Sequence, residues 1–315
     1  MQEACTEIRS VISEVTAGAG AETISLSGGL DSSILATLVG KNTNAYVMVA
    51  RDFPSSDLVY AQMAANQNGL EMKMLSASME EILEAIDDTV KILHVFNPIE
   101  IRNSIVIYLT MQGAKKDGFE SMMTGDGADE LFAGYAFFQK MSPEELKKDL
   151  ERIWGVMHFP SRLISSSMGL KLHTPFLDKR VVEIAMSIPV ELKVREEGGK
   201  KYGKWILRKA FENQLPRSIA WRDKAAMQDG SGTNGLSRFF NSVIQDSDFT
   251  AKAQKYEKNE HVKLQTKEAL FYYEIYRKYY DYPSMLSDSE TRCPNCSYSI
   301  EKGSHFCRMC GSYPI

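Results

Sequence analysis

Several features that indicate a membrane, a secreted location or a nucleic-acid coat are missing from this sequence. The apolar run IVIYL at 105–109 is far shorter than the roughly 20 residues that a membrane span requires. The first ten residues, MQEACTEIRS, contain acids and no apolar segment, so they do not resemble a secretion signal. The formal net charge of −4 lacks the basic excess typical of proteins that coat nucleic acid. We therefore expect a cytoplasmic protein that has no membrane partner.

Cysteine is scarce over most of the chain. Four of the five cysteines lie in the last 25 residues, with the spacing Cys293-x2-Cys296-x10-Cys307-x2-Cys310. Two such pairs are typical of a tetrahedral zinc site with four thiolate ligands. Disulfides are the alternative, but they are rare in a reducing cytoplasm. The pattern predicts a structural zinc ribbon over residues 290–315, and a segment this small could serve to dock RNA or another protein.

The rest of the composition is ordinary for a globular protein, with 43% apolar and 25% charged residues among 315. Over the first 140 residues short apolar segments alternate with helical periodicity, which predicts an α/β fold with a parallel sheet. The expected strands are 23–26, 44–50, 70–78 and 119–127. The expected helices are 1–17, 32–39, 57–69, 79–93 and 101–118.

The pattern changes after residue 140. We find no convincing strand in 142–281, where helical segments are expected at 143–157, 179–189, 204–213 and 263–280. The glycine-rich stretch 226–235 is expected to be a mobile loop, and 281–292 a linker. The sequence thus predicts an α/β domain over 1–140, a mainly helical part over 141–285 and the ribbon over 290–315.

Two glycine turns follow predicted parallel strands, where open α/β sheets bind ligands. The first is Ser27-Gly28-Gly29-Leu30-Asp31-Ser32. Paired glycines between a strand and a helix indicate backbone amides that hold an anion, commonly phosphate. The turn lacks the Gly-Lys-Ser/Thr ending of the Walker loop, so the usual nucleotide triphosphatase interpretation does not apply.

Acids in both turns are unexpected beside a bound phosphate. The second turn, Thr124-Gly125-Asp126-Gly127-Ala128-Asp129-Glu130, has acids at 126, 129 and 130. Carboxylates from two strand ends would repel one another and repel phosphate unless a hard divalent cation lies between them. We therefore predict that Asp31 and Asp129 bind Mg²⁺. The alternative for Asp31 alone is a helix cap, where aspartate is favoured.

These residues carry a family resemblance. The segment SLSGGLDSS resembles the pyrophosphate-binding loop (PP-loop) of the ATP pyrophosphatases, whose pattern is Ser-Gly-Gly-x-Asp-Ser. Four further segments, in the family's order, resemble the synthetase domain of glutamine-dependent asparagine synthetases. They are TGDGADELFAGY (124–135), PFLDKRVVEIAMSIP (175–189), GKWILRKAFENQLPRSIAWRDK (203–224) and DGSG (229–232). The similarity extends over roughly residues 20–282.

The resemblance implies a Rossmann-like PP-loop fold of the adenine nucleotide alpha hydrolase type. It also implies a ligase that adenylates a carboxylate with ATP, releases pyrophosphate and lets an amine attack the acyl-adenylate. The residues that it assigns to ATP and pyrophosphate binding are Leu26, Ser27, Gly28, Gly29, Leu30, Asp31, Ser32 and Gly125. The residues that it assigns to catalysis are Lys224, Asp126 and Lys204. A cation such as Lys224 would stabilise the negative oxygens that develop in the transition state. Outside the motif context, each lysine would be taken for a solvated surface charge.

Three departures from the family pattern stand out. Residue 2 is Gln2, so the glutaminase cysteine that follows the initiator methionine is absent, and Cys5 is expected to be only a helix residue. The family commonly has an acid and an arginine before PFLD, where this chain has Lys171 and His173. We interpret these two bases as lying near the active site and altering what is recognised there. The third departure is the added cysteine segment.

Two enzymatic interpretations remain open. The first is an amide-forming ligase that takes nitrogen from ammonia, an amine-bearing substrate or a separate glutaminase subunit, because about twenty residues before the loop leave no room for a glutaminase domain. The second is an enzyme that adenylates tRNA or another nucleic acid, with the ribbon holding the RNA. Sulfur transfer is disfavoured because the catalytic part has only Cys5. A non-catalytic protein is disfavoured because both acids and Lys224 are present.

Overall fold

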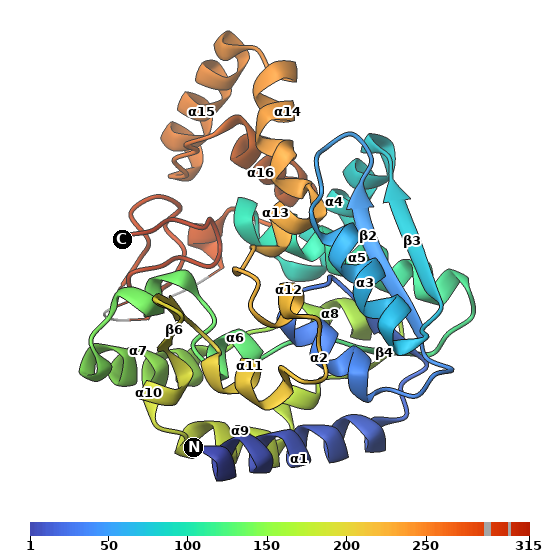
Figure 1. Ribbon diagram of the computed structural model, residues 1–315. Coiled ribbons are helices and arrows are strands. Elements are labelled where there is room, and N and C mark those ends of the chain that lie inside the picture. Colours follow the sequence, from blue (N-terminus) through green and yellow to red (C-terminus); the bar gives the residue numbers. More distant parts are fainter. Residues whose placement is uncertain (287–290, 302–303) are drawn as a thin grey trace.

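A five-stranded parallel sheet forms the centre of the molecule (Figure 1). The computed structural model describes the whole chain except residues 287–290 and 302–303. The strand order is β3-β2-β1-β4-β5. The strands are β1 (Thr23–Ser25), β2 (Asn44–Ala50), β3 (Met72–Ala77), β4 (Ser121–Met123) and β5 (Lys171–His173). The predicted α/β class with a parallel sheet is confirmed.

Helices surround this sheet and continue through the second half of the chain. Those up to residue 131 are α1 (Gln2–Ala19), α2 (Leu30–Leu38), α3 (Asp57–Asn68), α4 (Met79–Leu93), α5 (Pro98–Lys116) and α6 (Ala128–Leu131). The next are α7 (Pro143–Val156), α8 (Pro160–Ser167), α9 (Lys179–Ser187), α10 (Val190–Lys193), α11 (Trp205–Phe211) and α12 (Arg217–Ala220). The last are α13 (Met227–Ser231), α14 (Leu236–Val243), α15 (Asp246–Glu260) and α16 (Lys267–Tyr279). Short 3₁₀ turns lie at Ala136–Lys140, Pro175–Leu177, Thr233–Gly235 and Pro283–Met285.

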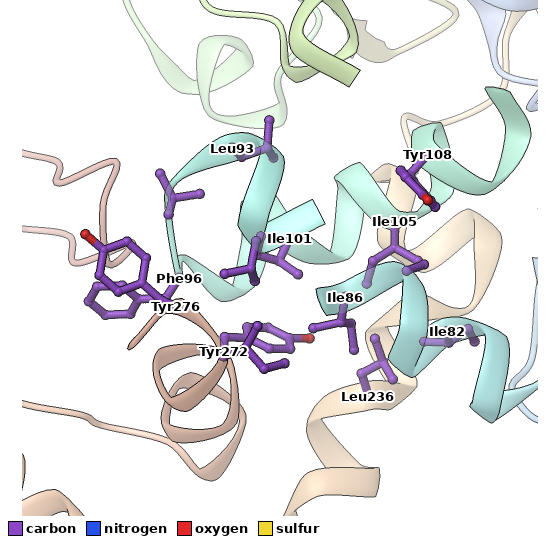
Figure 2. Close-up of a cluster of buried hydrophobic side chains, with 14 of the residues drawn as sticks. Ile82, Ile86, Leu93, Phe96, Ile101, Ile105, Tyr108, Leu236, Tyr272 and Tyr276 are labelled. Carbon is purple, nitrogen blue, oxygen red and sulfur yellow. The ribbon is translucent and has the colours of Figure 1, made fainter. Parts of the chain in front are cut away.

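The central strands β1, β2 and β4 are buried on both faces, as the continuous apolar sequence of β2 predicts, whereas the edge strand β3 is partly exposed. Side chains of a strand alternate between faces, so Ala45 and Val47 enter one buried cluster while Tyr46 and Met48 enter another. Helices α1, α2, α3, α9 and α11 contribute to the first cluster. Helices α4, α5, α14 and α16 contribute to the second, part of which Figure 2 shows. Helices from the second half of the chain therefore share both cores with the first half.

The helices α4 and α5 illustrate how local sequence fixes an element's start. The helix α4 spans the predicted residues, and Ser78 and Glu81 form a capping box at its start. The helix α5 begins at Pro98, three residues before the predicted Ile101. Its cap is Asn97, whose side chain accepts hydrogen bonds from the amides of Ile99 and Glu100.

The expectation that 142–281 lacks strands is wrong. The strand β5 pairs with β4 and completes the sheet, with Ser121 opposite Lys171. Two further strands, β6 (Arg195–Glu197) and β7 (Lys200–Tyr202), form an antiparallel hairpin. Each of the three strands has three residues, which is too few for an alternating pattern to be recognised.

The prediction of a mobile loop at 226–235 is also wrong. It forms α13 and a 3₁₀ turn, and Gly230, Ser231 and Thr233 are buried. The Gly230 carbonyl accepts hydrogen bonds from the Ser55 hydroxyl (2.5 Å) and the Ser56 amide (3.1 Å). These tertiary contacts override the local preference of glycine-rich sequence for an open loop.

The cysteine segment packs on the rest of the chain instead of standing apart from it. Cys293, Cys296, Cys307 and Met309 belong to the same buried cluster as Phe96 and Tyr276. The buried core of the protein therefore extends into this segment. Of the predicted linker 281–292, residues 287–290 lie outside the described residues. No helix among the described residues is long and apolar enough to cross a membrane.

Candidate functional site

The two glycine turns meet at the carboxyl ends of β1 and β4. A Cβ atom added to Gly125 would lie 3.0 Å from the Asp31 Cβ, which places the turns in direct contact. A cavity of about 720 Å³ opens beside them. This is the edge of a parallel sheet at which α/β proteins bind ligands. The topology therefore brings together two segments that lie almost a hundred residues apart in the sequence.

The backbone of the first turn lies against α3. Gly28 has φ +70°, and a Cβ atom there would lie 2.3 Å from the Ala61 amide nitrogen. Both observations require glycine at this position. The Ser27 and Ser32 hydroxyls lie 3.1 Å apart across the turn. The turn thus presents the start of α2 and two hydroxyls to the cavity, an arrangement suited to binding phosphate oxygens.

A buried lysine joins the acids of the two turns. The Nζ atom of Lys204 lies 2.5 Å from Asp31 Oδ2 and 2.7 Å from Asp129 Oδ1, and its side chain is only 3% exposed. Lys204 has φ +54°, a left-handed conformation that is costly for a residue with a side chain. The helix cap of α2 is Gly29, with no side-chain capping bond. The alternative interpretation of Asp31 as a helix cap is therefore wrong.

A second lysine approaches the same acids. Lys224 Nζ lies 2.6 Å from Asp129 Oδ2, opposite the oxygen that faces Lys204. Burial opposes ionisation of Asp129, but Lys204 and Lys224 outweigh it and hold the pKa of Asp129 well below its ordinary value. Burial likewise disfavours the charge on Lys224, yet Asp129 and then Asp31 raise the pKa of that lysine. Asp129 and Lys224 are therefore both charged at neutral pH.

The carboxylates of Asp31 and Asp129 fit a divalent cation. Both form an ion pair with the single Nζ atom of Lys204, so their oxygens lie close together. Asp31 Oδ1 is buried and has no hydrogen-bond partner among the described residues. A buried carboxylate oxygen without a partner is costly, and an oxygen-preferring ion such as Mg²⁺ would satisfy it.

Asp126 lies in the second turn and lines the cavity. Its Oδ2 atom accepts hydrogen bonds from the Ser161 hydroxyl (2.5 Å) and the Thr124 hydroxyl (2.9 Å). Burial raises the pKa of Asp126 above its ordinary value, although these hydrogen bonds act in the opposite direction. The two hydroxyls therefore fix the orientation of a carboxyl group that binds a proton more readily than a solvated aspartate.

Sequence reasoning missed a cluster around Arg222, which lies two residues before Lys224. Arg222 pairs with Asp57 at 3.2 Å, donates to the Gly28 carbonyl at 3.3 Å and stacks on Tyr60 at 3.8 Å. Burial raises the pKa of Asp57 to about 6, against the opposing effect of Arg222. Arg222 thus connects the first glycine turn (residues 27–32) to α3 and to the segment that carries Lys224. Arg222 lies within the AWRDK motif, so that motif could have identified it as a site residue together with Lys224.

Another part of the lining was also missed. It consists of Glu100 and Asn103 of α5, His158 between α7 and α8, and Phe306 and Arg308 of the cysteine segment. Burial raises the pKa of Glu100 to about 7, although nearby Arg308 acts to lower it. No sequence motif links these positions, so only the folded chain shows that they share the cavity.

Most residues singled out from the sequence line this cavity. They are Leu26, Ser27, Gly29, Leu30, Asp31, Ser32, Gly125, Asp126, Asp129, Lys204 and Lys224. Gly28 is absent from the described lining because it faces α3. Tyr135, the last residue of the 124–135 motif, lines the cavity, whereas Phe176 is buried in the core. Lys171 and His173 are not among the lining residues either, although the His173 carbonyl accepts a hydrogen bond from the amide of Thr124, the first residue of the second glycine turn.

The four cysteines of the C-terminal segment converge on one point. Their Sγ atoms all lie within 4.8 Å of one another, and the closest pairs are 3.6 and 3.7 Å apart. A tetrahedral ion with bonds of about 2.3 Å places its sulfurs roughly 3.8 Å apart. Each cysteine pair is followed by a residue in left-handed conformation, Ser297 or Gly311, whose amide donates back to the first cysteine's carbonyl. The two turns repeat one geometry, which is suited to a four-thiolate metal site.

The charge balance at Lys204 leads to a stability prediction. Replacing Lys204 with methionine leaves Asp31 without a cation at close range, and breaking a buried ion pair typically costs about 3–5 kcal/mol. We expect Lys204→Met to lower the midpoint of thermal unfolding, measured by circular dichroism. Millimolar Mg²⁺ should restore more of that midpoint in the variant than it adds to the wild type, because the ion supplies the missing charge. The control is Lys209→Met on the same helix, where the lysine is more exposed. An unchanged midpoint in Lys204→Met would show that Lys204 does not stabilise the two carboxylates.

Comparisons with known proteins agree with this geometry. The family model for asparagine synthase matches residues 22–163 and 144–293. The asparagine synthetase of Gallus gallus, named as glutamine-hydrolysing, is 31% identical over 278 residues, which are 81% of this chain and 48% of the relative. Asparagine synthetase B of Escherichia coli K12 is 30% identical over 280 residues, which are 82% of this chain and 50% of the relative. The chain spans about half the length of these curated relatives. On the extent of the family match, this chain belongs to the asparagine synthase family.

Proposed function

We propose that this protein is an ATP-dependent carbon–nitrogen ligase that adenylates a carboxylate and converts the adenylate to an amide. The observation that carries the proposal is the convergence of the first glycine turn, two carboxylates and two lysines on one cavity. Membership of the asparagine synthase family supports it. The relatives are named as glutamine-hydrolysing asparagine synthetases, so their products suggest the class of acceptor.

In the first step, a carboxylate oxygen of the acceptor attacks the α-phosphorus of ATP, and the bond to the departing pyrophosphate breaks. The first turn would bind the pyrophosphate through its backbone and the hydroxyls of Ser27 and Ser32. Mg²⁺, held by Asp31 and Asp129, would neutralise the phosphate oxygens. Lys224 and Lys204 lie beside the same carboxylates, so their charges would stabilise negative oxygens as these develop.

In the second step, an amine attacks the carbonyl carbon of the adenylate, and AMP leaves. The attacking nitrogen must lose a proton. We propose that Asp126 accepts it, since the hydroxyls of Ser161 and Thr124 both donate to its Oδ2 atom and orient the carboxyl group. The raised pKa of Asp126 favours proton uptake.

The proposed chemistry predicts its products. With ATP, Mg²⁺, ammonium and a panel of carboxylic acids, the chain should form AMP and pyrophosphate, which are separated by anion-exchange chromatography. Asp31→Ala and Asp129→Ala should each lower the rate by at least about 100-fold, since each removes a ligand of the ion and a partner of the lysines. Asp149→Ala, on the surface of α7, is the control that should retain activity. Formation of ADP and inorganic phosphate would contradict the proposal.

We also propose that the nitrogen reaches this chain as ammonia, as an amine-bearing substrate or from a separate glutaminase subunit. Burial raises the pKa of the Cys5 thiol, which disfavours the nucleophilic thiolate. Cys5 lies in α1, and its side chain packs beside the cluster formed by α1 and α11. The remaining four cysteines are those that converge on one point in the C-terminal segment.

This proposal predicts that the purified chain does not hydrolyse glutamine. Glutamate release, measured with a coupled glutamate dehydrogenase assay, should be undetectable. Amide formation should appear when ammonium replaces glutamine or when a partner is added. Cys5→Ser should leave ammonium-dependent activity unchanged. Glutamate release that is lost in Cys5→Ser would show that this chain generates its own ammonia.

We further propose that the four cysteines hold one structural zinc ion. Four thiolates close the coordination shell, so the ion would not bind substrate. Because the cysteines belong to a buried cluster with Phe96 and Tyr276, the ion would stabilise the body of the protein as well as its own segment. The cysteine segment packs on this chain and contributes to its cavity, which favours a structural role for the segment over RNA binding.

Metal analysis tests the zinc proposal. Protein purified without chelator should contain one zinc per chain by plasma mass spectrometry. Cys296→Ser should lose the metal and unfold at a lower temperature, whereas Cys5→Ser should retain both the metal and the wild-type midpoint. A chain that contains no zinc yet has an unchanged midpoint in Cys296→Ser would refute the proposal.

A further inference from the structure

Lys193, the last residue of α10, is a fully buried lysine that the proposed mechanism does not use. Its exposed fraction is 0%, and its Nζ atom has no hydrogen-bond partner among the described residues. Lysine is almost never fully buried without a partner, because removing an ammonium group from water is costly. The surroundings of this amine therefore need an explanation.

One indole ring is the polarisable group beside this amine. The Nζ atom lies over the ring of Trp154, 4.4 Å from its centre. An ammonium group at this distance from a tryptophan face is attracted by the ring electrons, whereas a neutral amine is not. Trp154 itself packs against a small apolar cluster formed by Ala133, Phe138, Leu146 and Leu150. The ring is thus the group that compensates part of the cost of a buried charge.

Trp154 connects this amine to the second glycine turn. The helices α6, α7 and α10 lie side by side (Figure 1). The Nε1–H group of Trp154 donates to the Glu130 carbonyl at 3.0 Å. Glu130 follows Asp129 directly, and its carboxyl group accepts a hydrogen bond from the hydroxyl of Tyr135, which lines the cavity. A chain of contacts therefore runs from Lys193 to the residue beside a proposed Mg²⁺ ligand.

Burial is the only influence on the pKa of Lys193, and it lowers that pKa from the ordinary value of 10.5 to about 7. None of the charged or titratable groups on the surrounding elements changes it. These groups are Glu130 on α6, Tyr135 after it, Glu191 on α10, and Arg208 and Lys209 on α11, whereas the fully buried residues of α7 are Leu146 and Leu150. The charge of Lys193 therefore changes close to neutral pH.

The buried amine lowers the stability of the fold in a way that depends on pH. Between about pH 7 and 10.5 the unfolded chain binds the proton of Lys193 more tightly than the folded chain does. The loss of stability is therefore complete below about pH 7, and it disappears as the pH rises towards 10.5. Residues that are unfavourable for stability tend to be found where function requires them.

We propose that Lys193 is a positioning residue for the second glycine turn. Its ammonium form holds the Trp154 ring against the Glu130 carbonyl and thereby keeps Asp129 in place for Mg²⁺, and loss of the proton releases the ring. Lys193 is not among the residues that line the cavity, so it acts on the ion only through Trp154. This inference rests on the proposed binding of Mg²⁺ by Asp31 and Asp129.

The first measurement follows the ring and needs no Mg²⁺. Trp154 is one of three tryptophans, so its emission is the difference between each protein and the same protein with Trp154→Phe. This emission should change in one step with a midpoint near pH 7, and the step should be absent from Lys193→Met. Lys209→Met is the matched control, because Lys209 lies 5.7 Å from the Trp221 ring but pairs with Glu212, and this variant should keep the step. A wild type without the step, or a step that persists in Lys193→Met, would overturn the proposal.

The second measurement is the affinity of the full chain for Mg²⁺, by isothermal titration calorimetry on either side of the titration. Near pH 6, Lys193→Met should bind Mg²⁺ about fivefold more weakly than the wild type, and near pH 9 the two should agree, because the wild-type lysine is then neutral. Trp154→Phe should bind more weakly at both pH values, since it also loses the hydrogen bond to Glu130. Equal weakening by Lys193→Met at both pH values, or stronger binding near pH 6, would overturn the proposal.

Thermal unfolding, measured by circular dichroism, shows whether weaker binding comes from a damaged fold. Lys193→Met should unfold at a higher temperature than the wild type, and by more near pH 6 than near pH 9, because the buried charge is removed. A lower midpoint in this variant would show that the lysine is kept for stability and would contradict the proposal. A wild type that does not bind Mg²⁺ would refute the metal site and the role of Lys193 together. A chain that binds Mg²⁺ in the expected pattern but forms ADP would refute the ligase proposal alone.

Discussion

The site depends on one buried ammonium group that holds two carboxylates together. Asp31 and Asp129 come from turns after different strands, and without a cation between them their charges would push the two turns apart. Lys204 lies within 2.7 Å of both. A Cβ atom at Gly134 would lie 1.9 Å from Asp129 Oδ1 and 2.2 Å from Lys204 Cε. The backbone of Gly134 therefore packs directly against this ion pair and leaves no room for a side chain. The left-handed backbone of Lys204 indicates that tertiary contacts maintain this geometry at a local cost.

A second set of contacts attaches the segment that carries Lys224 to the turn and to α3. Arg208 is buried and donates to the carbonyls of Gly203, Ala220 and Arg222. Arg222 in turn reaches the Gly28 carbonyl and Asp57. Cations that bind backbone carbonyls fix the path of a loop without requiring regular secondary structure. Lys224 therefore reaches Asp129 from a segment whose own course is determined by these two arginines.

The cysteine segment links metal binding to the shape of the cavity. Its two cysteine turns are packed into the core beside Phe96 and Tyr276, and one of them carries Arg308 to the lining. A metal ion that orders these turns would also order this part of the cavity, because small segments of this kind gain much of their folding free energy from the ion. The segment is thus part of the body of the protein in its packing, although its sequence pattern resembles an independent unit.

The sequence by itself determined the alternation of strands and helices, the two glycine turns and the cysteine spacing. These features depend on local chemistry, such as the capping of α4 by Ser78 and Glu81 and the positive φ of Gly28. The tertiary structure alone decided that β5 completes the sheet and that 226–235 forms a packed helix and turn. It alone placed Glu100, Asn103 and Arg308 around one cavity. These positions lie up to about two hundred residues apart and have no spacing pattern, so their proximity follows from how the elements pack and could not be inferred from neighbours in the chain.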